Sequence, residues 1–228
     1  MSYSKIIEQL ANSEITIETA LKRAKLLLHK LGDTKLDEWV NSEIVGYSED
    51  SVLPKYRVIT GRLVGNYLKG NSGNYIKFTN ASLPIGNVPD EFRKELLTVK
   101  FFEGVATLSV LADSRGETGC ICKPIPADYY GLLGKYSGNP FITITDARVE
   151  VSYHEVATIL SCIETKLLDV LIKLEDEFGK LDDLDIDLSN VDQTYLEQVI
   201  REMRTIVFNT SIRIGDGNTI KGSDINAQ

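Results

Sequence analysis

The sequence is poor in several features that define whole classes of protein. It has three cysteines and two histidines in 228 residues, too few for a disulfide scaffold or for an evident zinc site. No apolar run is long enough to cross a bilayer. The first residues, MSYSKIIEQL, lack the apolar core and cleavage site of a signal peptide. We therefore expect a cytoplasmic globular protein, made of one domain or of one domain with an appendage.

Basic residues are also scarce relative to acidic ones. The chain has 25 lysines and arginines against 33 aspartates and glutamates, which gives a net charge of −8. Between Leu174 and Asp192 there are eight acids and one lysine, so this segment carries −7 and the rest of the chain only −1. Neither part provides the positive surface that a phosphate backbone requires. Nucleic acid is therefore disfavoured as a partner.

The common catalytic motifs are missing as well. There is no Gly-x-Ser-x-Gly elbow and no dinucleotide fingerprint, and the Gly-rich stretch 215–218 is not followed by the Lys and helix of a phosphate loop. Asp183, Asp185 and Asp187 have the spacing that opens a calcium loop, but the turn glycine and the final bidentate acid are absent. We interpret this segment as a solvated acidic linker. The sequence names no catalytic residue, no metal site and no cofactor.

The residues that most often carry chemistry have simpler structural interpretations. Cys120 and Cys122 alternate with Ile121, which predicts a buried or edge strand. His154 lies at the start of a long predicted helix without an evident nucleophile beside it, so we interpret it as an ordinary helix-entry residue. His29 falls on the polar side of a predicted helix.

Three helices are predicted at the N-terminus, over residues 4–11, 16–31 and 34–45. Thr16 is a suitable N-cap for the second helix, and Gly32 ends it. Asp33 or Thr34 caps the third helix, and Gly46 ends that one. The short connections favour an antiparallel helical hairpin packed through its apolar faces.

The hydrophobic period then changes from that of helices to that of strands. Residues 56–69 and 75–79 are predicted to form a β-hairpin around the turn sequence GNSGN. Further along, helices are expected over 90–97 and 104–112 and a helical turn over 127–133, with strands over 119–123 and 141–152. A long amphipathic helix is predicted over 153–178.

These elements predict an α+β fold. It consists of the helical hairpin, a small mainly antiparallel sheet with inserted helices, and the long C-terminal helix packed across that sheet. We expect residues 1–178 to form the main domain, 179–193 an acidic linker, 194–208 a C-terminal helix and 209–228 a short β-like tail. The tail is too small to bury its own apolar side chains. Its isoleucines are therefore candidate assembly residues: Ile212, Ile214, Ile220 and Ile225.

One block joins the helical part to the β part and contains the only tryptophan. It runs from Leu36 to Arg57, LDEWVNSEIVGYSEDSVLPKYR, and its distinctive residues are Trp39, Glu43, Gly46, Tyr47, Pro54, Tyr56 and Arg57. In one interpretation Glu43 orients Arg57 in a pocket that grips a carboxylate or phosphate. In the other, which we favour, the aromatic residues fill a joint in the fold and the two charged residues pair at its edge.

This block, with the amphipathic segment before it, resembles the AbiTii domain of bacterial abortive-infection proteins. The resemblance extends from the first helices to about Phe178 and is most specific in the block itself. It implies a part in defence against phage, often beside other conflict-system proteins. It transfers no catalytic residue to this chain.

Two classes of function follow from these observations. The first is a non-enzymatic sensor, adaptor or scaffold that assembles through its C-terminal helix and tail, with copies of itself, with an operon-encoded protein or with both. The second is a toxic enzyme, a metal-dependent hydrolase of nucleotides or nucleic acid, in which Glu38, Glu43 or Glu95 would converge on a metal. We favour the first class, with neither a membrane nor a nucleic acid as the partner.

Overall fold

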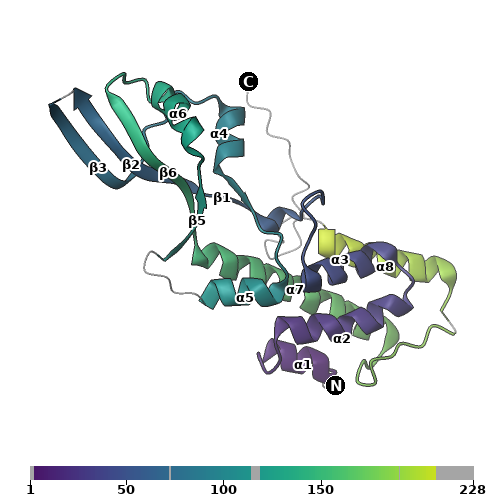
Figure 1. The fold of residues 1–228 in the computed structure, drawn as a ribbon. Helices are drawn as coiled ribbons and strands as arrows, with labels where there is room; N and C mark the ends of the chain where they lie inside the picture. Colours follow the sequence, from purple (N-terminus) through teal and green to yellow (C-terminus); the bar gives the residue numbers. More distant parts are fainter. Residues whose placement is uncertain (1–2, 72, 114–118, 190, 209–228) are drawn as a thin grey trace, which may run out of the picture. The chain divides into compact units, whose positions relative to one another are not determined.

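A computed structural model describes residues 3–71, 73–113, 119–189 and 191–208 (Figure 1). The chain divides into two compact units. The helical unit comprises the described parts of Met1–Tyr47 and Ser161–Gln228, and the sheet unit comprises those of Ser48–Leu160. The predicted β-like tail, with its four isoleucines, lies outside the described residues.

The three predicted N-terminal helices are confirmed. They are α1 (Lys5–Ala11), α2 (Ile17–Lys30) and α3 (Thr34–Val45). The side chain of Thr16 accepts a hydrogen bond from the Thr19 amide at 3.1 Å, and Asp33 does the same for Leu36 at 2.9 Å. Gly46 ends α3 with a φ of +106°, a region that side chains disfavour, so a glycine is required there.

Two further helices complete the helical unit. Helix α7 (Tyr153–Phe178) contributes the part that starts at Ser161, and α8 (Gln193–Phe208) follows it. Each helix buries residues at helical spacing, as the amphipathic patterns predict. The buried residues of α3, α7 and α8 include Leu36, Trp39, Val40, Ile163, Leu167, Leu171, Leu174, Val199, Met203 and Val207.

The acidic segment between α7 and α8 has no helix or strand, but it is not the fully solvated linker that its composition predicts. Leu181 and Ile186 are buried. The Asp182 carboxylate accepts a hydrogen bond from the Lys5 amide at 2.8 Å, and Asp185 forms an ion pair with Lys30. The apolar residues that alternate with the acids fix the segment to the helical unit.

The sheet unit is built on a four-stranded antiparallel sheet in the order β3-β2-β6-β5. The strands are β2 (Arg62–Asn71), β3 (Asn74–Ser82), β5 (Cys120–Pro124) and β6 (Ile142–Ser152). The predicted hairpin is confirmed as β2 and β3, and Cys120 and Cys122 lie on an edge strand, as predicted. A second antiparallel pair consists of β1 (Val58–Thr60) and β4 (Thr98–Lys100).

The predicted start of the first hairpin strand is wrong. Residues 56 and 57 belong to the short 3₁₀ helix η1 (Lys55–Arg57), and Gly61 separates β1 from β2. A Cβ at Gly61 would lie 2.4 Å from Cγ1 of Val149 and 2.8 Å from the carbonyl oxygen of Glu150. The backbone can pass this close to β6 only without a side chain. Before Gly61 the chain pairs with β4, and after it with β3 and β6.

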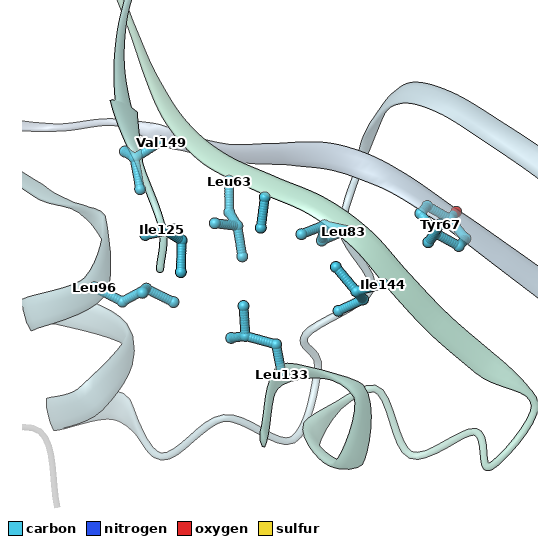
Figure 2. Close-up of a cluster of buried hydrophobic side chains, with 9 residues drawn as sticks. Leu63, Tyr67, Leu83, Leu96, Ile125, Leu133, Ile144 and Val149 are labelled. Atoms are coloured by element: carbon cyan, nitrogen blue, oxygen red, sulfur yellow. The ribbon is translucent and has the colours of Figure 1, made fainter. Parts of the chain in front are cut away.

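Helices α4 (Asp90–Leu97) and α6 (Tyr130–Tyr136) provide the apolar cover of the sheet, and α5 (Val105–Asp113) and the 3₁₀ helix η2 (Ala127–Tyr129) complete this unit. Figure 2 shows Leu96 of α4 and Leu133 of α6 directed toward side chains of β2 and β6. The strand residues in this core are Leu63, Tyr67, Ile144, Ala147 and Val149. The long helix α7 was expected across the sheet, but its residues from Ser161 onward belong to the helical unit.

Candidate functional site

The distinctive block of the sequence is placed partly on each unit. Trp39 and Glu43 lie on α3, four residues apart and therefore on the same face of the helix, and Gly46 and Tyr47 follow them. Trp39 is 2% exposed and Glu43 is fully buried. A buried carboxylate requires hydrogen-bond donors, and the Tyr47 hydroxyl donates to Oε1 of Glu43 at 2.7 Å.

Two residues of helix α7, Cys162 and Lys166, also belong to the helical unit. Burial raises the pKa of the Cys162 thiol; the Lys166 ammonium lowers it in part, and the Glu43 carboxylate raises it further. Burial lowers the pKa of Lys166, whose Nζ donates to the Ile206 carbonyl oxygen at 2.7 Å. A thiol whose pKa is raised stays protonated at neutral pH and is a weak nucleophile. The direction of this shift does not favour Cys162 as an activated nucleophile.

In the sheet unit Arg57 is fully buried and supports the chain that follows β4. Its Nη1 donates to the carbonyl oxygen of Phe101 at 3.1 Å and to that of Glu103 at 2.7 Å. Its backbone amide donates to the Pro54 carbonyl oxygen at 2.9 Å, and its own carbonyl oxygen accepts from the Phe101 amide at 3.0 Å. Pro54 precedes η1, and Tyr56 lies within it. These contacts give Arg57 a positioning role in its unit.

A charged cluster on the sheet was not among the residues singled out from the sequence. Arg148 forms ion pairs with Asp146 at 2.8 Å and with Glu150 at 2.9 Å, and it also hydrogen-bonds Asn80 of β3. Glu150 is 7% exposed and accepts a further hydrogen bond from Arg62 of β2 at 3.3 Å. The signal was present in the sequence, because Asp146, Arg148 and Glu150 alternate along a predicted strand and so share one face.

A shallow depression of about 270 Å³ lies beside Glu150. Its polar lining comes from Thr60, Arg62, Cys120, Ser152 and Glu155 as well as Glu150. The two carboxylates and the arginine give it mixed charge. Because Glu150 is already engaged by Arg62 and Arg148, the cluster acts first as a cross-strand brace of the sheet.

The hydrolase hypothesis needs acids that converge on a metal. Glu38 and Glu43 lie on α3 of the helical unit, whereas Glu95 lies on α4 of the sheet unit. Among the residues that the structure describes, no group of three His, Cys, Asp or Glu side chains could hold a metal ion. The arrangement therefore does not favour this alternative.

Three polar contacts within the helical unit were missed because they join distant parts of the sequence. The buried Ser4 donates its amide to Glu175 at 2.8 Å, and its hydroxyl accepts from the Leu181 amide at 2.8 Å. Asp33 pairs with Arg204 of α8. None of these contacts follows from local pattern, since each spans more than 170 residues.

Comparison with known proteins gives one family. The family model described as AbiTii matches residues 3–216. No curated protein and no solved structure matches the chain. In the described part of the chain, every helix is too short or too polar to cross a membrane.

Proposed function

Because the chain belongs to the AbiTii family, whose members are associated with abortive-infection defence against phage, we propose that it acts in the bacterial cytoplasm as a non-enzymatic component of such a system. It would serve as a sensor, adaptor or scaffold that assembles with copies of itself or with an operon-encoded protein. Its tail would provide the contact, and its C-terminal helix would hold that tail in place.

The observation that carries this proposal is the way helix α8 is held. Its apolar residues Val199, Met203 and Val207 are buried, so this face is not available to a partner. Polar contacts fix the same helix, since Arg204 pairs with Asp33 and Glu202 pairs with Lys173 at 2.7 Å. Helix α8 would therefore act as a rigid anchor, and the assembly contact would be made by residues 209–228 that follow it.

The charged groups of the described residues also support a structural component rather than an enzyme. Lys173 contacts both Glu177 and Glu202, and Glu175 accepts from Ser4 and Lys180. Each of these groups links two elements of the helical unit. A catalytic acid or base needs instead a proton-transfer partner within reach of a substrate.

The test compares the full chain with a variant that lacks residues 209–228. We expect both proteins to unfold at the same temperature, but the truncated one to have a lower mass in light scattering and to lose protection of cells in a phage challenge. A chain that is monomeric both before and after truncation would contradict the assembly. The challenge is repeated with and without the neighbouring genes, because a scaffold needs its partner whereas a toxic enzyme acts alone.

Nucleotide pools measured by mass spectrometry in the infected cells separate the two classes. An enzyme that degrades nucleotides would change these pools during growth arrest, and a scaffold on its own would leave them unchanged. A change in the pools caused by this chain alone would overturn the proposal.

A further inference from the structure

The two edges of the four-stranded sheet differ in how they are protected. Strand β5, at one edge, has five residues and ends in Pro124, which has no amide hydrogen to offer a further strand. Beside it, Lys123 reaches the Thr98 carbonyl oxygen at 3.1 Å. Strand β3, at the other edge, has nine residues and is largely exposed. Among the described residues, β2 is its one strand neighbour.

The backbone groups of β3 that face away from β2 can be assigned from the neighbouring ladder. Gly70 is the β2 partner of Tyr75, and its amide donates to the Phe141 carbonyl oxygen at 2.9 Å, on the side of β6. In an antiparallel pair, residues whose amide and carbonyl groups point away from the partner strand lie opposite each other. The amide and carbonyl groups of Tyr75, and by alternation those of Lys77, therefore point to the open edge.

The side chains on this edge include two of the exposed large apolar residues. Tyr75 is 57% exposed and Ile76 is 64% exposed. Ile76 lies on the same face of the strand as Phe78, which stacks on Tyr67 with ring centroids 4.6 Å apart and packs against the core of the sheet unit. The apolar face of the sheet thus continues to the edge through Ile76. A single lysine, Lys77, lies between these residues.

We propose that the open edge of β3 pairs antiparallel with β3 of a second copy, so that the two sheets continue across a twofold axis at Ile76. This deepens the proposed function, because it names a second copy as the partner and a contact surface other than the tail. Isologous pairing of this kind is a common route to a homodimer.

The side chains of β3 favour this register over the neighbouring one. With Ile76 on the axis, Ile76 meets its own copy, and Tyr75 lies opposite Lys77 of the second copy, where the ring can cover the lysine stem. A shift of the axis to Lys77 would place two ammonium groups directly opposite each other, which is destabilising in a sheet. The register centred on Ile76 pairs apolar with apolar and separates like charges.

Disulfide trapping tests the proposal in the full chain, in a background with C120S, C122S and C162A. Partners that are not hydrogen-bonded to each other in an antiparallel ladder have Cα atoms about 4.5 Å apart, within the range of a disulfide. In the proposed register Ile76 occupies such a position. We therefore expect Ile76→Cys to form a covalent dimer under mild oxidation roughly tenfold faster than Lys77→Cys, whose two copies are offset along the strands.

Lys77→Cys is the matched control, because residue 77 lies on the same strand, is also exposed and would carry the same thiol. Failure of Ile76→Cys to dimerise, or equal trapping of the two variants, would overturn the proposal; Lys77 would then act as a charge that keeps the edge single. The same two cysteine variants are also oxidised in a chain that lacks residues 209–228. We expect Ile76→Cys still to dimerise there, and a dimer that requires the tail would overturn the edge pairing. If Ile76→Cys does not dimerise but the full chain is still an oligomer, the edge pairing is wrong and the proposed function stands.

Discussion

Asp33 and Arg204 form an ion pair between the N-terminus of helix α3 and helix α8, although 171 residues separate them in sequence. The same carboxylate caps α3 through the Leu36 amide. Asp33 is 5% exposed, so its charge depends on these donors. One side chain therefore both starts a helix and holds the last described helix of the unit.

These two roles can be separated by substitution. Asp33→Asn retains an N-cap acceptor but loses the charge, and we expect it to lower the free energy of unfolding by about 1 kcal/mol. Asp33→Ala loses both and should cost about 2–3 kcal/mol. Urea unfolding measures the difference. Equal losses for the two variants would show that the cap contributes nothing beyond the ion pair, and Arg204→Ala completes a double-mutant cycle.

The stability of the helical unit is expected to fall in acid. Burial alone would raise the pKa of Asp33, but hydrogen bonds from Arg204 and the Leu36 amide hold it below its ordinary 3.8. Burial would likewise raise the pKa of Glu175, but Lys180 and Ser4 hold it below 4.5. A carboxylate whose pKa is lower in the folded state contributes stability that is present above its unfolded-state pKa and lost as the pH falls through the folded-state value.

We therefore expect the free energy of unfolding to decrease as the pH falls below about 4.5. A variant with Asp33→Asn and Glu175→Gln should have lower stability at neutral pH and a flatter dependence in this range. Urea unfolding at several pH values from about 3 to 6 measures both curves. Parallel curves for the variant and the parent would assign the acid sensitivity to other groups.

Arg57→Ala is expected to destabilise the sheet unit by about 3 kcal/mol, because the substitution leaves the carbonyl oxygens of Phe101 and Glu103 without this donor and empties a buried volume. Arg62→Ala is the matched control. Its side chain is 69% exposed, and we expect a loss of about 1 kcal/mol or less. Thermal unfolding followed by circular dichroism measures both.

Arg57→Ala also addresses the pocket interpretation of the block, together with Glu43→Gln. If Arg57→Ala and Glu43→Gln abolished protection against phage without lowering the melting temperature, these residues would act in binding rather than in folding. We expect instead that Arg57→Ala loses protection only to the extent that it unfolds the protein. Glu43→Gln keeps an acceptor for the Tyr47 hydroxyl, so it should leave protection nearly unchanged.

Local signals explain what could be predicted from the sequence. Thr16, Asp33 and Gly46 set helix boundaries through contacts within four residues, so their pattern was sufficient. The split at Gly61 was not predictable in this way, because it depends on the approach of β6, about ninety residues later in sequence. The allocation of α7 to the helical unit also depends on tertiary packing, which periodicity does not encode.

The candidate site shows the same limit. The block around Trp39 is conspicuous in composition, and two of its buried residues form hydrogen bonds within their own units, Glu43 with Tyr47 and Arg57 with Phe101. The cluster around Arg148 was visible as alternating charges, but only the pairing of Arg62 with Glu150 across β2 and β6 shows that they support one another. Strand register therefore carries the missing information.

We expect the protein to lose more stability when Arg148 alone is replaced than when Arg148 and Glu150 are replaced together. Arg148→Met leaves the buried Glu150 with Arg62 as its remaining ion-pair partner, and we expect a loss of about 3 kcal/mol. Adding Glu150→Gln removes the buried charge that is then compensated by Arg62 but no longer by Arg148, and should restore part of that stability. Urea unfolding of both variants checks the order. A double variant less stable than Arg148→Met would contradict this account.

Replacing two glycines by alanine is expected to change the free energy of unfolding in opposite directions. A Cβ at Gly65, which is paired with Ala147 beside the irregularity between β2 and β6, would lie 2.0 Å from the Asp146 carbonyl oxygen. Gly65→Ala must therefore separate two paired strands, and we expect it to cost about 3 kcal/mol. Gly131 lies in helix α6, and an added Cβ there would meet no heavy atom within 4 Å. Gly131→Ala should stabilise by about 0.5 kcal/mol, since alanine restricts the unfolded chain and favours the helix. Thermal unfolding of the two variants checks both signs, and a neutral Gly65→Ala would show that β2 and β6 are not held this close.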